Sequence, residues 1–529
     1  MFGLNYIDIS LIVLYFIIIF GVAIYISFKE KLGRDTSSYF LGGRDMGWFV
    51  IGASLFASNI GAEHLVGLAG SGASGGIAVA QFEIISGIIL LLLGWVFVPF
   101  YLKSGIYTMP EFLEIRYSKG ARIYLSLISI IAYILTKISV TIAATGIIFE
   151  AIGLDFWSGA VAIIVATGLY TMLGGLKAVL YTDMIQMFIL IISSILITWI
   201  GLRHIGGWAE LQSTAGPDFF SIWKPLNHPE FPWTGIIFGA PILGVWYWCT
   251  DQFIVQRVLA AKDIKNARRG AIFGGYLKML PLFIFVIPGI IAYALSQKGI
   301  LSYGSADQAF PSLVRTLLPP GIRGLVIAGL FAALMSSLSS VFNSCSTLFT
   351  LDIYKKIKPQ SSEKRLVMVG QIVTFFLVIL GVLWIPFIDN ISNRLFTYLQ
   401  SVQAYISPPI AAVFLLGIFF KRLNAKGAMA SLLTGLGLGT ARLYGEINKE
   451  SLSGSFFYLS NINFLHFAIL LFVLCVAILI LVSLLTKEPD YTKFENITYN
   501  KTTLFDDKQD VWLSALLLII IISTWVFFS

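Results

Sequence analysis

Seven ionisable side chains lie inside segments of this sequence that are otherwise apolar enough to span a lipid bilayer. They are Glu63, His64, Glu83, Lys137, Asp183, Asp251 and Lys278. An ionisable group at membrane depth is costly and usually faces a cavity or a partner, so each is a candidate for holding a polar solute or an ion. Taken singly, each fits equally well as part of an ion pair that ties two helices together. No nucleophile, base and orienting group can be assembled from them, and no metal cluster, so enzyme chemistry is not expected.

The densest polar signal is the stretch SNIGAEHLVGLAGSGASGG at residues 58–76. With the residues before it, the stretch begins as an apolar helix, meets polar residues and glycine near its middle, and resumes as an apolar helix. Such a break survives in a bilayer only where the released backbone groups line a cavity, and in transporters these breaks hold ions and substrate. A glycine-rich helix packed against close neighbours would explain the glycines, but not Glu63 and His64. A discontinuous helix is therefore expected here.

A second unusual run, APILGVWYWCTDQFIVQR, lies five apolar segments later. In it, Pro241 and Gly244 precede the aromatic residues Trp246, Tyr247 and Trp248. Transporters built from two inverted five-helix halves place their discontinuous helices at corresponding positions. The second to sixth segments are therefore expected to pair with the seventh to eleventh. This expectation rests on spacing, because no sequence identity between the halves is visible.

Hydroxyl groups crowd the segment GLVIAGLFAALMSSLSSVFNSCSTLFTLDIYK, which carries Ser336, Ser337, Ser339 and Ser340. Hydroxyl and carbonyl oxygens are hard ligands that suit an alkali or alkaline-earth cation. No carboxylate lies close by in the sequence, which favours a monovalent ion. Serines in membrane helices also bond to the preceding turn. The segment indicates an ion site only when it is paired with the discontinuous helix near residues 58–76.

The remaining polar groups suggest an uncharged, oxygen-rich solute such as a sugar. The side chains that offer hydrogen-bond donors and acceptors are His64, Glu83, Lys278 and Gln400. Tyr247 and Trp248 add flat rings. Sugars need both kinds of surface, whereas an apolar or purely anionic substrate would not need this mixture.

Composition indicates which elements must position these groups. The chain has 529 residues, of which 57% are hydrophobic and 12% charged, and many of its apolar runs reach about twenty residues, the length that crosses a bilayer core. Backbone groups in lipid must be satisfied within helices or a closed barrel, and alternating strand patterns are absent, so an all-α membrane protein is expected. Fourteen segments are expected, near 7–28, 47–70, 77–101, 120–151, 156–175, 178–205, 233–260, 270–297, 322–354, 366–388, 394–420, 427–444, 464–486 and 511–528.

The net charge of +8 is explained by membrane topology rather than by a nucleic-acid partner. If the N-terminus is outside, 26 of the 36 basic residues lie in connections on the cytoplasmic side and eight lie in connections on the opposite side. The positive-inside rule therefore predicts that both termini are extracellular or periplasmic. The cysteines all fall in apolar segments, where neither a disulfide framework nor a zinc site is expected.

Several motifs in a fixed order resemble the sodium/solute symporters, most closely the sodium/glucose and sodium/galactose cotransporters. They are SLFASNIGAEHLVGLAGSGASGG, GWVFVPFYLKSGIYTMPEFL, YTDMIQ, WYWCTDQFIVQR, GYLKMLPLFIFVIPGIIAY, ALMSSLSSVFNSCSTLFTLDIYK and YISPPIAAVFLLGIFFKR, within about residues 38–430. The resemblance implies fourteen helices, the inverted-repeat core of the leucine-transporter fold, and sodium-coupled symport of glucose and/or galactose by alternating access. The implied parts are a first peripheral helix and cytoplasmic loop (1–46), repeat one (47–206), an outer loop (207–232), repeat two (233–420) and peripheral helices (421–529).

The resemblance also implies a site, residue by residue. The sodium ion would be held by the carbonyls of Ala57, Ile60 and Ala333 and the hydroxyls of Ser336 and Ser337. The sugar would be bound by Asn59, His64, Glu83, Ser86, Trp248, Lys278 and Gln400, with Tyr247 stacked on its ring as the inner gate. A second sodium ion would use Asp183, Ser339 and Ser340. Gly244 stands where family members have Thr, Ser or Asn, so one sugar contact is expected to be lost or replaced by water.

Alternatives stay open within this family. Myo-inositol, sialic acid or another neutral or weakly charged solute is the alternative cargo, and a sugar-gated sensor or ion conductor is the alternative to a carrier. The partners expected are the sugar, sodium ions and the lipid bilayer, with a monomer as the functional unit and no nucleic acid. The bare N-terminus and low cysteine count favour a bacterial inner membrane.

Overall fold

A computed structural model describes residues 4–29, 35–61, 63–151, 153, 155–384, 395–448, 454–492, 494 and 507–529. In these ranges the protein is all α, with two isolated β-bridges, Met46 with Ala261 and Lys224 with Pro232. The connection between the last two expected segments, residues 487–510, lies partly outside the described residues.

The α-helices of the first half of the chain are α1 (Tyr6–Lys29), α2 (Thr36–Leu41), α3 (Trp48–Asn59), α4 (Ala69–Gly75), α5 (Gln81–Leu92), α6 (Val98–Ser104), α7 (Met109–Arg116), α8 (Lys119–Ala132), α9 (Ser139–Ala151), α10 (Phe156–Ile205), α11 (Trp208–Ala215), α12 (Ala240–Gly244) and α13 (Gln252–Leu259). Those of the second half are α14 (Ile264–Leu277), α15 (Ile287–Gln297), α16 (Ala309–Leu317), α17 (Ile322–Thr347), α18 (Lys355–Ile357), α19 (Glu363–Trp384), α20 (Leu395–Phe419), α21 (Ala425–Ile447), α22 (Ser455–Asn461), α23 (Phe464–Leu485) and α24 (Lys508–Phe527).

Short segments of π- or 3-10 helix join or interrupt these helices. The π segments are η2 (Glu63–Leu68), η4 (Leu93–Phe97), η5 (Tyr133–Ile138), η7 (Gly235–Gly239), η8 (Val245–Thr250), η9 (Leu282–Val286) and η11 (Leu348–Tyr354). The 3-10 segments are η1 (Gly42–Arg44), η3 (Gly76–Ala80), η6 (Pro217–Phe220) and η10 (Ala306–Gln308). Single π turns inside α-helices often mark functional positions.

Ten helical stretches in the described part of the chain are long and apolar enough to cross a membrane. This confirms an all-helical membrane protein, while the expected count of fourteen is not confirmed. Two of the stretches hold 42 and 47 residues, well beyond the roughly twenty residues of one crossing. Glycine bends both of them. Gly76 has φ 75° and Gly175, within α10, has φ 54°, a conformation that glycine adopts without steric cost.

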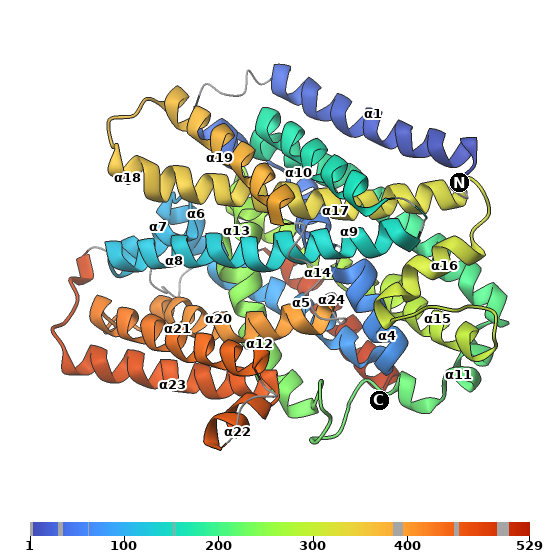
Figure 1. The fold of residues 1–529 in the computed structure, drawn as a ribbon. Helices are drawn as coiled ribbons and strands as arrows, with labels where there is room; N and C mark the ends of the chain where they lie inside the picture. The colour runs from blue at the N-terminus through green and yellow to red at the C-terminus, as the bar shows by residue number, and fades with distance from the viewer. Residues whose placement is uncertain are drawn as a thin grey trace.

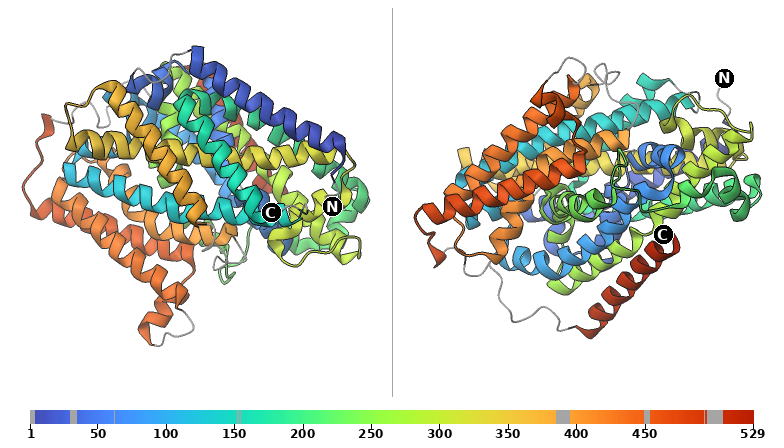
Figure 2. Two further views of the ribbon diagram at one scale, coloured as in Figure 1. Left: turned by 45° about the horizontal axis from the view of Figure 1, so that its top comes forward. Right: turned by 90° about the horizontal axis from the view of Figure 1, so that it is seen from below.

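The centre of the molecule is built from α3, α10, α14 and α17. The long helix α10 packs along α17 and α1, and α3 packs on α14 and α10. Figure 1 shows α17, α8 and α9 running across the middle of the view, with α20, α21 and α23 gathered on one side. The last helix, α24, packs instead against α5 and α14, and in Figure 2 it lies apart from α21 and α23.

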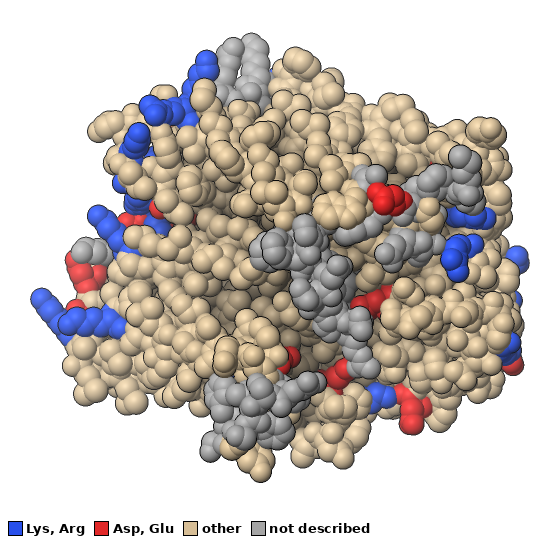
Figure 3. Space-filling model, in the orientation of Figure 1, with Lys and Arg blue, Asp and Glu red and all other residues tan. Residues whose placement is uncertain are grey.

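Charged side chains are unevenly distributed along the helices. On the face shown in Figure 3, Lys and Arg gather mainly at the end where Figure 1 places α18 and the start of α8. Both ends of the chain lie toward the opposite end in Figures 1 and 2. Most of the remaining surface on this face is uncharged, as a surface in contact with lipid requires.

Candidate functional site

The discontinuous helix expected at residues 58–76 is confirmed. Helix α3 ends at Asn59, Ile60 is extended with φ −77° and ψ 91°, and the π segment η2 begins at Glu63. An extended residue cannot continue the i to i−4 ladder, so backbone oxygens at this point are released from the helix. The break is buried among other helices, where only a cavity or a polar partner can satisfy such groups.

Helix α17 brings its hydroxyl groups to this break. Ser336 donates to the carbonyl oxygens of Ala57 at 2.8 Å and Ala333 at 3.1 Å, and Ser337 donates to the Ser58 carbonyl at 3.3 Å. These serines are at most 1% exposed. Hydroxyls and released carbonyls from two helices thus surround one buried point. This donor set of neutral oxygens suits a monovalent cation of the size and hardness of sodium.

The second unusual run, residues 240–257, also contains a break, but neither its proline nor its glycine forms it. Gly244 is helical with φ −60° and ψ −45°, and Pro241 follows the π segment η7 inside the continuous helical stretch Gly235–Thr250. The chain instead breaks at Asp251, which is extended with φ −82° and ψ 128° between η8 and α13. Its carboxylate caps α13 by accepting from the Phe253 amide at 3.3 Å, and Tyr133 donates to it as well. The aromatic run therefore ends at a capped half-helix.

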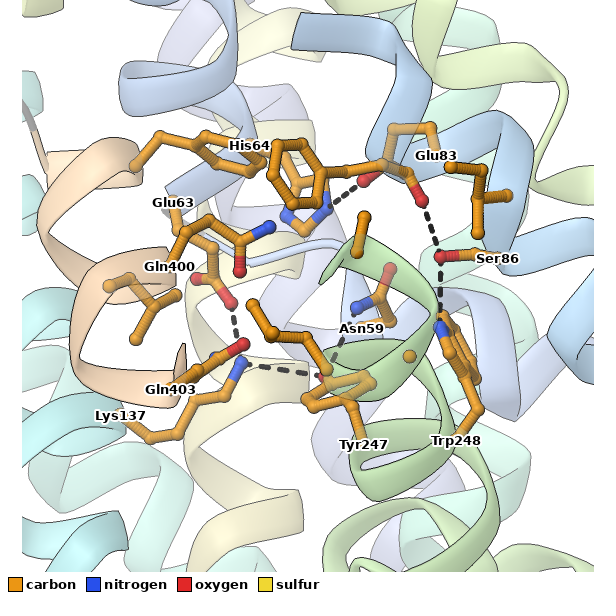
Figure 4. Close-up of a pocket in the computed structure, with 17 residues that line it drawn as sticks. Asn59, Glu63, His64, Glu83, Ser86, Lys137, Tyr247, Trp248, Gln400 and Gln403 are labelled. Carbon is orange, nitrogen blue, oxygen red and sulfur yellow. Dashed lines mark hydrogen bonds and ion pairs between the residues drawn. The ribbon is translucent and has the colours of Figure 1, made fainter. Parts of the chain in front are cut away.

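A buried cavity lies beside the break in α3 and against the aromatic run of η8 (Figure 4). Its free volume is about 60 Å³, room for about four or five water molecules, so side chains must move before a hexose fits. The cavity is lined by Asn59, Glu63, His64, Phe82, Glu83, Ile85, Ser86, Lys137, Ala240, Leu243, Gly244, Tyr247, Trp248, Phe396, Leu399, Gln400 and Gln403. It therefore collects residues from α3, η2, α5, η5, α12, η8 and α20.

Seven of the eight residues expected to bind sugar line this cavity. They are Asn59, His64, Glu83, Ser86, Tyr247, Trp248 and Gln400. The eighth, Lys278, is not among the lining residues. It donates to Glu83 and, at 2.5 Å, to the Asn59 amide oxygen, so it acts on the cavity through them.

Most of these side chains are already paired with one another. His64 Nε2 lies 3.3 Å from Glu83 Oε1, Asn59 donates to the Tyr247 hydroxyl at 3.0 Å, and Trp248 Nε1 donates to Ser86 Oγ at 2.9 Å. Figure 4 shows these groups converging from opposite walls. The network orients donors, acceptors and two aromatic rings toward one small polar space, the arrangement that a polyhydroxylated ligand requires.

Three polar lining residues were not among the expected sugar ligands. Lys137 forms an ion pair with Glu63 at 2.8 Å and donates to the Tyr247 hydroxyl at 3.4 Å, and Gln403 lies near them in Figure 4. Glu63 and Lys137 carried a signal, because both are charges inside apolar segments. Gln403 follows Gln400 by three residues, a spacing that puts both on one helix face.

Two of the three residues expected at a second sodium site, Asp183 and Ser340, meet through the hydroxyl of Ser58. Asp183 Oδ2 accepts from Ser54 at 2.6 Å and from Ser58 at 3.0 Å, and Ser340 donates to the same Ser58 hydroxyl at 3.0 Å. Arg257 also donates to Ser58, at 2.9 Å, and to Ser340. The third candidate, Ser339, donates to the Ser336 carbonyl at 3.0 Å. An arginine was not foreseen in this group.

The sequence profile of the Sodium:solute symporter family matches residues 39–435. Similar proteins include sodium/glucose cotransporter 1 of Oryctolagus cuniculus, 40% identical over 526 residues that cover 91% of this chain and 79% of that protein. Sodium/glucose cotransporter 4 of Homo sapiens is 40% identical over 527 residues that cover 92% of this chain and 76% of that protein.

Solved structures with the same fold include a sodium-coupled sialic acid symporter in a substrate-bound outward-open state. It has a TM-score of 0.78 at 24% identity and covers 92% of this chain and 99% of its own. A nucleobase-cation-symport-1 family transporter has a TM-score of 0.55 at 16% identity, covering 88% and 99%. At these identities the likeness concerns the arrangement of helices alone.

Proposed function

This chain belongs to the sodium:solute symporter family, and on that premise we propose that it couples the entry of sodium to the uptake of a hexose, glucose and/or galactose. It is a multi-pass membrane transporter rather than an enzyme, with sodium as the coupling ion. The two sodium/glucose cotransporters named above are animal proteins, so the bacterial inner membrane expected from the sequence is not borne out.

One observation carries the proposal: a single break in α3 faces both the ion donors and the cavity. Ala57 accepts a hydrogen bond from α17, and two residues later Asn59 lines the cavity and bonds to Tyr247. A cation held between α3 and α17 fixes the last turn of α3, and with it the orientation of Asn59. Binding of one ligand then favours the arrangement that binds the other, which is the thermodynamic content of coupling.

The mixture of lining groups favours a neutral sugar over an anionic cargo. Lys137 is paired with Glu63, and Lys278 with Glu83, so neither lysine of this described cluster offers an uncompensated charge to a carboxylate. A sialic acid symporter shares the fold, and sialic acid or myo-inositol remains the alternative cargo to be tested.

The finer architecture is also proposed on this premise. Fourteen crossings, with residues 47–206 and 233–420 as inverted repeats, follow from the ten stretches if those that bend at Gly76 and Gly175 each count as two, and if the shorter apolar stretch Gly235–Thr250 and helix α21 each add one. Basic residues at the α18 end favour a cytoplasmic position for that end, with both termini outside. A single chain forms the cavity and the ion site, which supports a functional monomer.

The test is uptake by proteoliposomes that contain the purified protein. An inward sodium gradient should accumulate labelled glucose or galactose above equilibrium, and an equal potassium gradient should not. Unlabelled fructose, myo-inositol and sialic acid should compete poorly. Accumulation of myo-inositol or sialic acid instead would change the cargo, and sugar binding without accumulation would favour a sensor or an ion conductor.

A further inference from the structure

Glu63 and Lys137 form a buried ion pair that the proposed sugar and sodium sites leave without a task. Glu63 opens η2 directly after the break in α3, and Lys137 lies in η5. Their side chains are 2% and 6% exposed and their charged atoms lie 2.8 Å apart. Both residues line the cavity (Figure 4). Because charged side chains at membrane depth are energetically costly, an ion pair in such a place is a candidate for a functional role.

The two carboxylate oxygens of Glu63 face different partners. Oε1 accepts from Lys137. Oε2 lies against Gly61, where a built Cβ atom would overlap both this oxygen and the Ser337 hydroxyl. The carboxylate therefore stands next to a donor of the proposed sodium site. A side chain at position 61 would separate them, which explains why glycine fits there.

Lys137 in turn reaches the residue proposed as the inner gate. Its ammonium donates to the Tyr247 hydroxyl at 3.4 Å and lies 5.0 Å from the centre of the Tyr247 ring and 5.2 Å from that of Phe253. These are distances at which a cation is attracted to an aromatic face. The ion site, the carboxylate, the lysine and the tyrosine thus form one continuous chain of contacts.

The proposed sodium site is built from neutral oxygens. None of its ligands therefore carries a charge that would offset the effect of nearby charged side chains on a bound cation. Glu63 and Lys137 lie on one side of it. On another side, Asp183 and Arg257 offset each other through the Ser58 hydroxyl. Removing one member of either pair would leave a net charge near the ion. The Coulomb interaction between two nearby charges is strong in a partly buried site.

We propose that Glu63 is a charge-balancing residue of the sodium site and that Lys137 transmits sodium binding to Tyr247. The inference rests on the proposed function. A cation bound beside Ser337 attracts the Glu63 carboxylate and competes with Lys137 for it. Lys137 then changes its contacts with Tyr247. Sodium binding thereby alters how firmly Lys137 holds the Tyr247 side chain in place.

The proposal predicts opposite effects of two neutralising substitutions. Glu63→Gln leaves the Lys137 charge near the ion and should raise the sodium concentration for half-maximal binding about tenfold. Lys137→Met leaves the carboxylate and should lower it about tenfold. The double variant Glu63→Gln/Lys137→Met removes both charges and should return close to the unmodified protein, because the charges compensate each other. Sodium should, however, no longer lower the sugar KM in it.

Binding is measured without sugar, as the rise in melting temperature of the purified protein with sodium at constant ionic strength, because a ligand of the native state stabilises it. Potassium replaces sodium as the baseline. Lys356→Met is the matched control, since Lys356 also pairs with a glutamate, Glu114, at 2.8 Å but lies on α18, whose residues are exposed. It should leave sodium binding unchanged.

Shifts of both single variants in the same direction, or unchanged sodium binding in both, would overturn the charge-balancing role. If Glu63→Gln does not fold, the other two variants still test the proposal. Only charge balance predicts that Lys137→Met binds sodium more tightly and that the double variant returns to the sodium affinity of the unmodified protein. Absence of any sodium-specific stabilisation of the unmodified protein would refute the proposed function itself, so the two failures are distinguishable.

Discussion

Ser336 donates its hydroxyl to the Ala57 carbonyl over 2.8 Å, and this bond joins α17 to the last turn of α3. The two residues are separated by 279 positions in the chain. Their contact lies where α3 loses its helical ladder, so the oxygens available to a cation come from two helices at once. An ion bound there would hold α3 and α17 together more firmly than the hydrogen bond between Ser336 and Ala57 does alone.

The serine hydroxyls should therefore set sodium affinity. Ser337→Ala removes the hydroxyl that donates to the Ser58 carbonyl, and we expect the sodium concentration for half-maximal uptake to rise about fivefold or more, since one hydrogen-bonding ligand is lost. Ser346→Ala is the control, because that hydroxyl of α17 donates to Gly370 on α19 instead. Unchanged sodium dependence of Ser337→Ala would remove the residue from the site.

Gln400 should act on sugar affinity alone. It lines the cavity opposite Trp248 and is remote in sequence from the ion donors. Gln400→Ala should raise the sugar KM about tenfold, the effect of losing a hydrogen bond in a desolvated site, and leave sodium binding intact. Gln371→Ala on α19, whose amide donates to the Met172 carbonyl, should keep the KM of the unmodified protein. Equal kinetics in the two variants would contradict the assignment of Gln400.

Lys278 should influence both stability and sugar binding, because it lies behind the cavity wall. Lys278→Met leaves the buried Glu83 carboxylate without its ammonium partner, and breaking a buried pair costs about 3–5 kcal/mol. The variant should melt at a lower temperature and show a higher sugar KM. Lys278→Met/Glu83→Gln should recover part of the stability without recovering the KM. A single variant with normal stability would contradict the pairing.

The sequence predicted the first break, and for the second it indicated the segment but not the residue. Around residue 60, polar residues and glycines interrupt an apolar helix, and both kinds of residue predict a break at the same position. In the later run, Pro241 and Gly244 both lie inside the continuous helical stretch Gly235–Thr250. The break occurs at Asp251 because its carboxylate caps the following helix. A single aspartate in an apolar run is not enough to predict such a cap.

Partners from distant segments could not be read from spacing. Glu63 and Lys137 are 74 positions apart, and the sequence alone identifies each only as a costly charge in an apolar segment. Arg257 at the Ser58 and Ser340 hydroxyls was likewise not foreseen. Only the folded arrangement shows that these charges compensate one another, because helix packing, not sequence periodicity, brings α13 to α17 and η5 to η2.

Gly244 offers a test of the sugar contact that this chain is expected to lack. A Cβ atom there would lie 3.0 Å from Ile89 Cγ1, a contact that a small rotation of the isoleucine relieves. Gly244→Ser adds a hydroxyl to the cavity wall and should lower the sugar KM about threefold to tenfold. Gly244→Ala supplies the same Cβ without the hydroxyl and should not lower it. If both variants behave alike, the serine hydroxyl makes no sugar contact.

The number of sodium ions per sugar should depend on Asp183. Its Oδ2 is held by Ser54 and Ser58, while its buried Oδ1 has no hydrogen-bond partner in the described part of the chain. A buried carboxylate oxygen without a partner is costly, and a second sodium ion near Ser339 and Ser340 would satisfy it. We therefore expect two charges to enter with each sugar. Simultaneous measurement of current and labelled sugar flux in the same membranes gives this ratio. Asp183→Asn should reduce it to one while sugar-dependent current persists. A ratio of one in the unmodified protein would rule out the second ion and leave Arg257 as the permanent cation at that position.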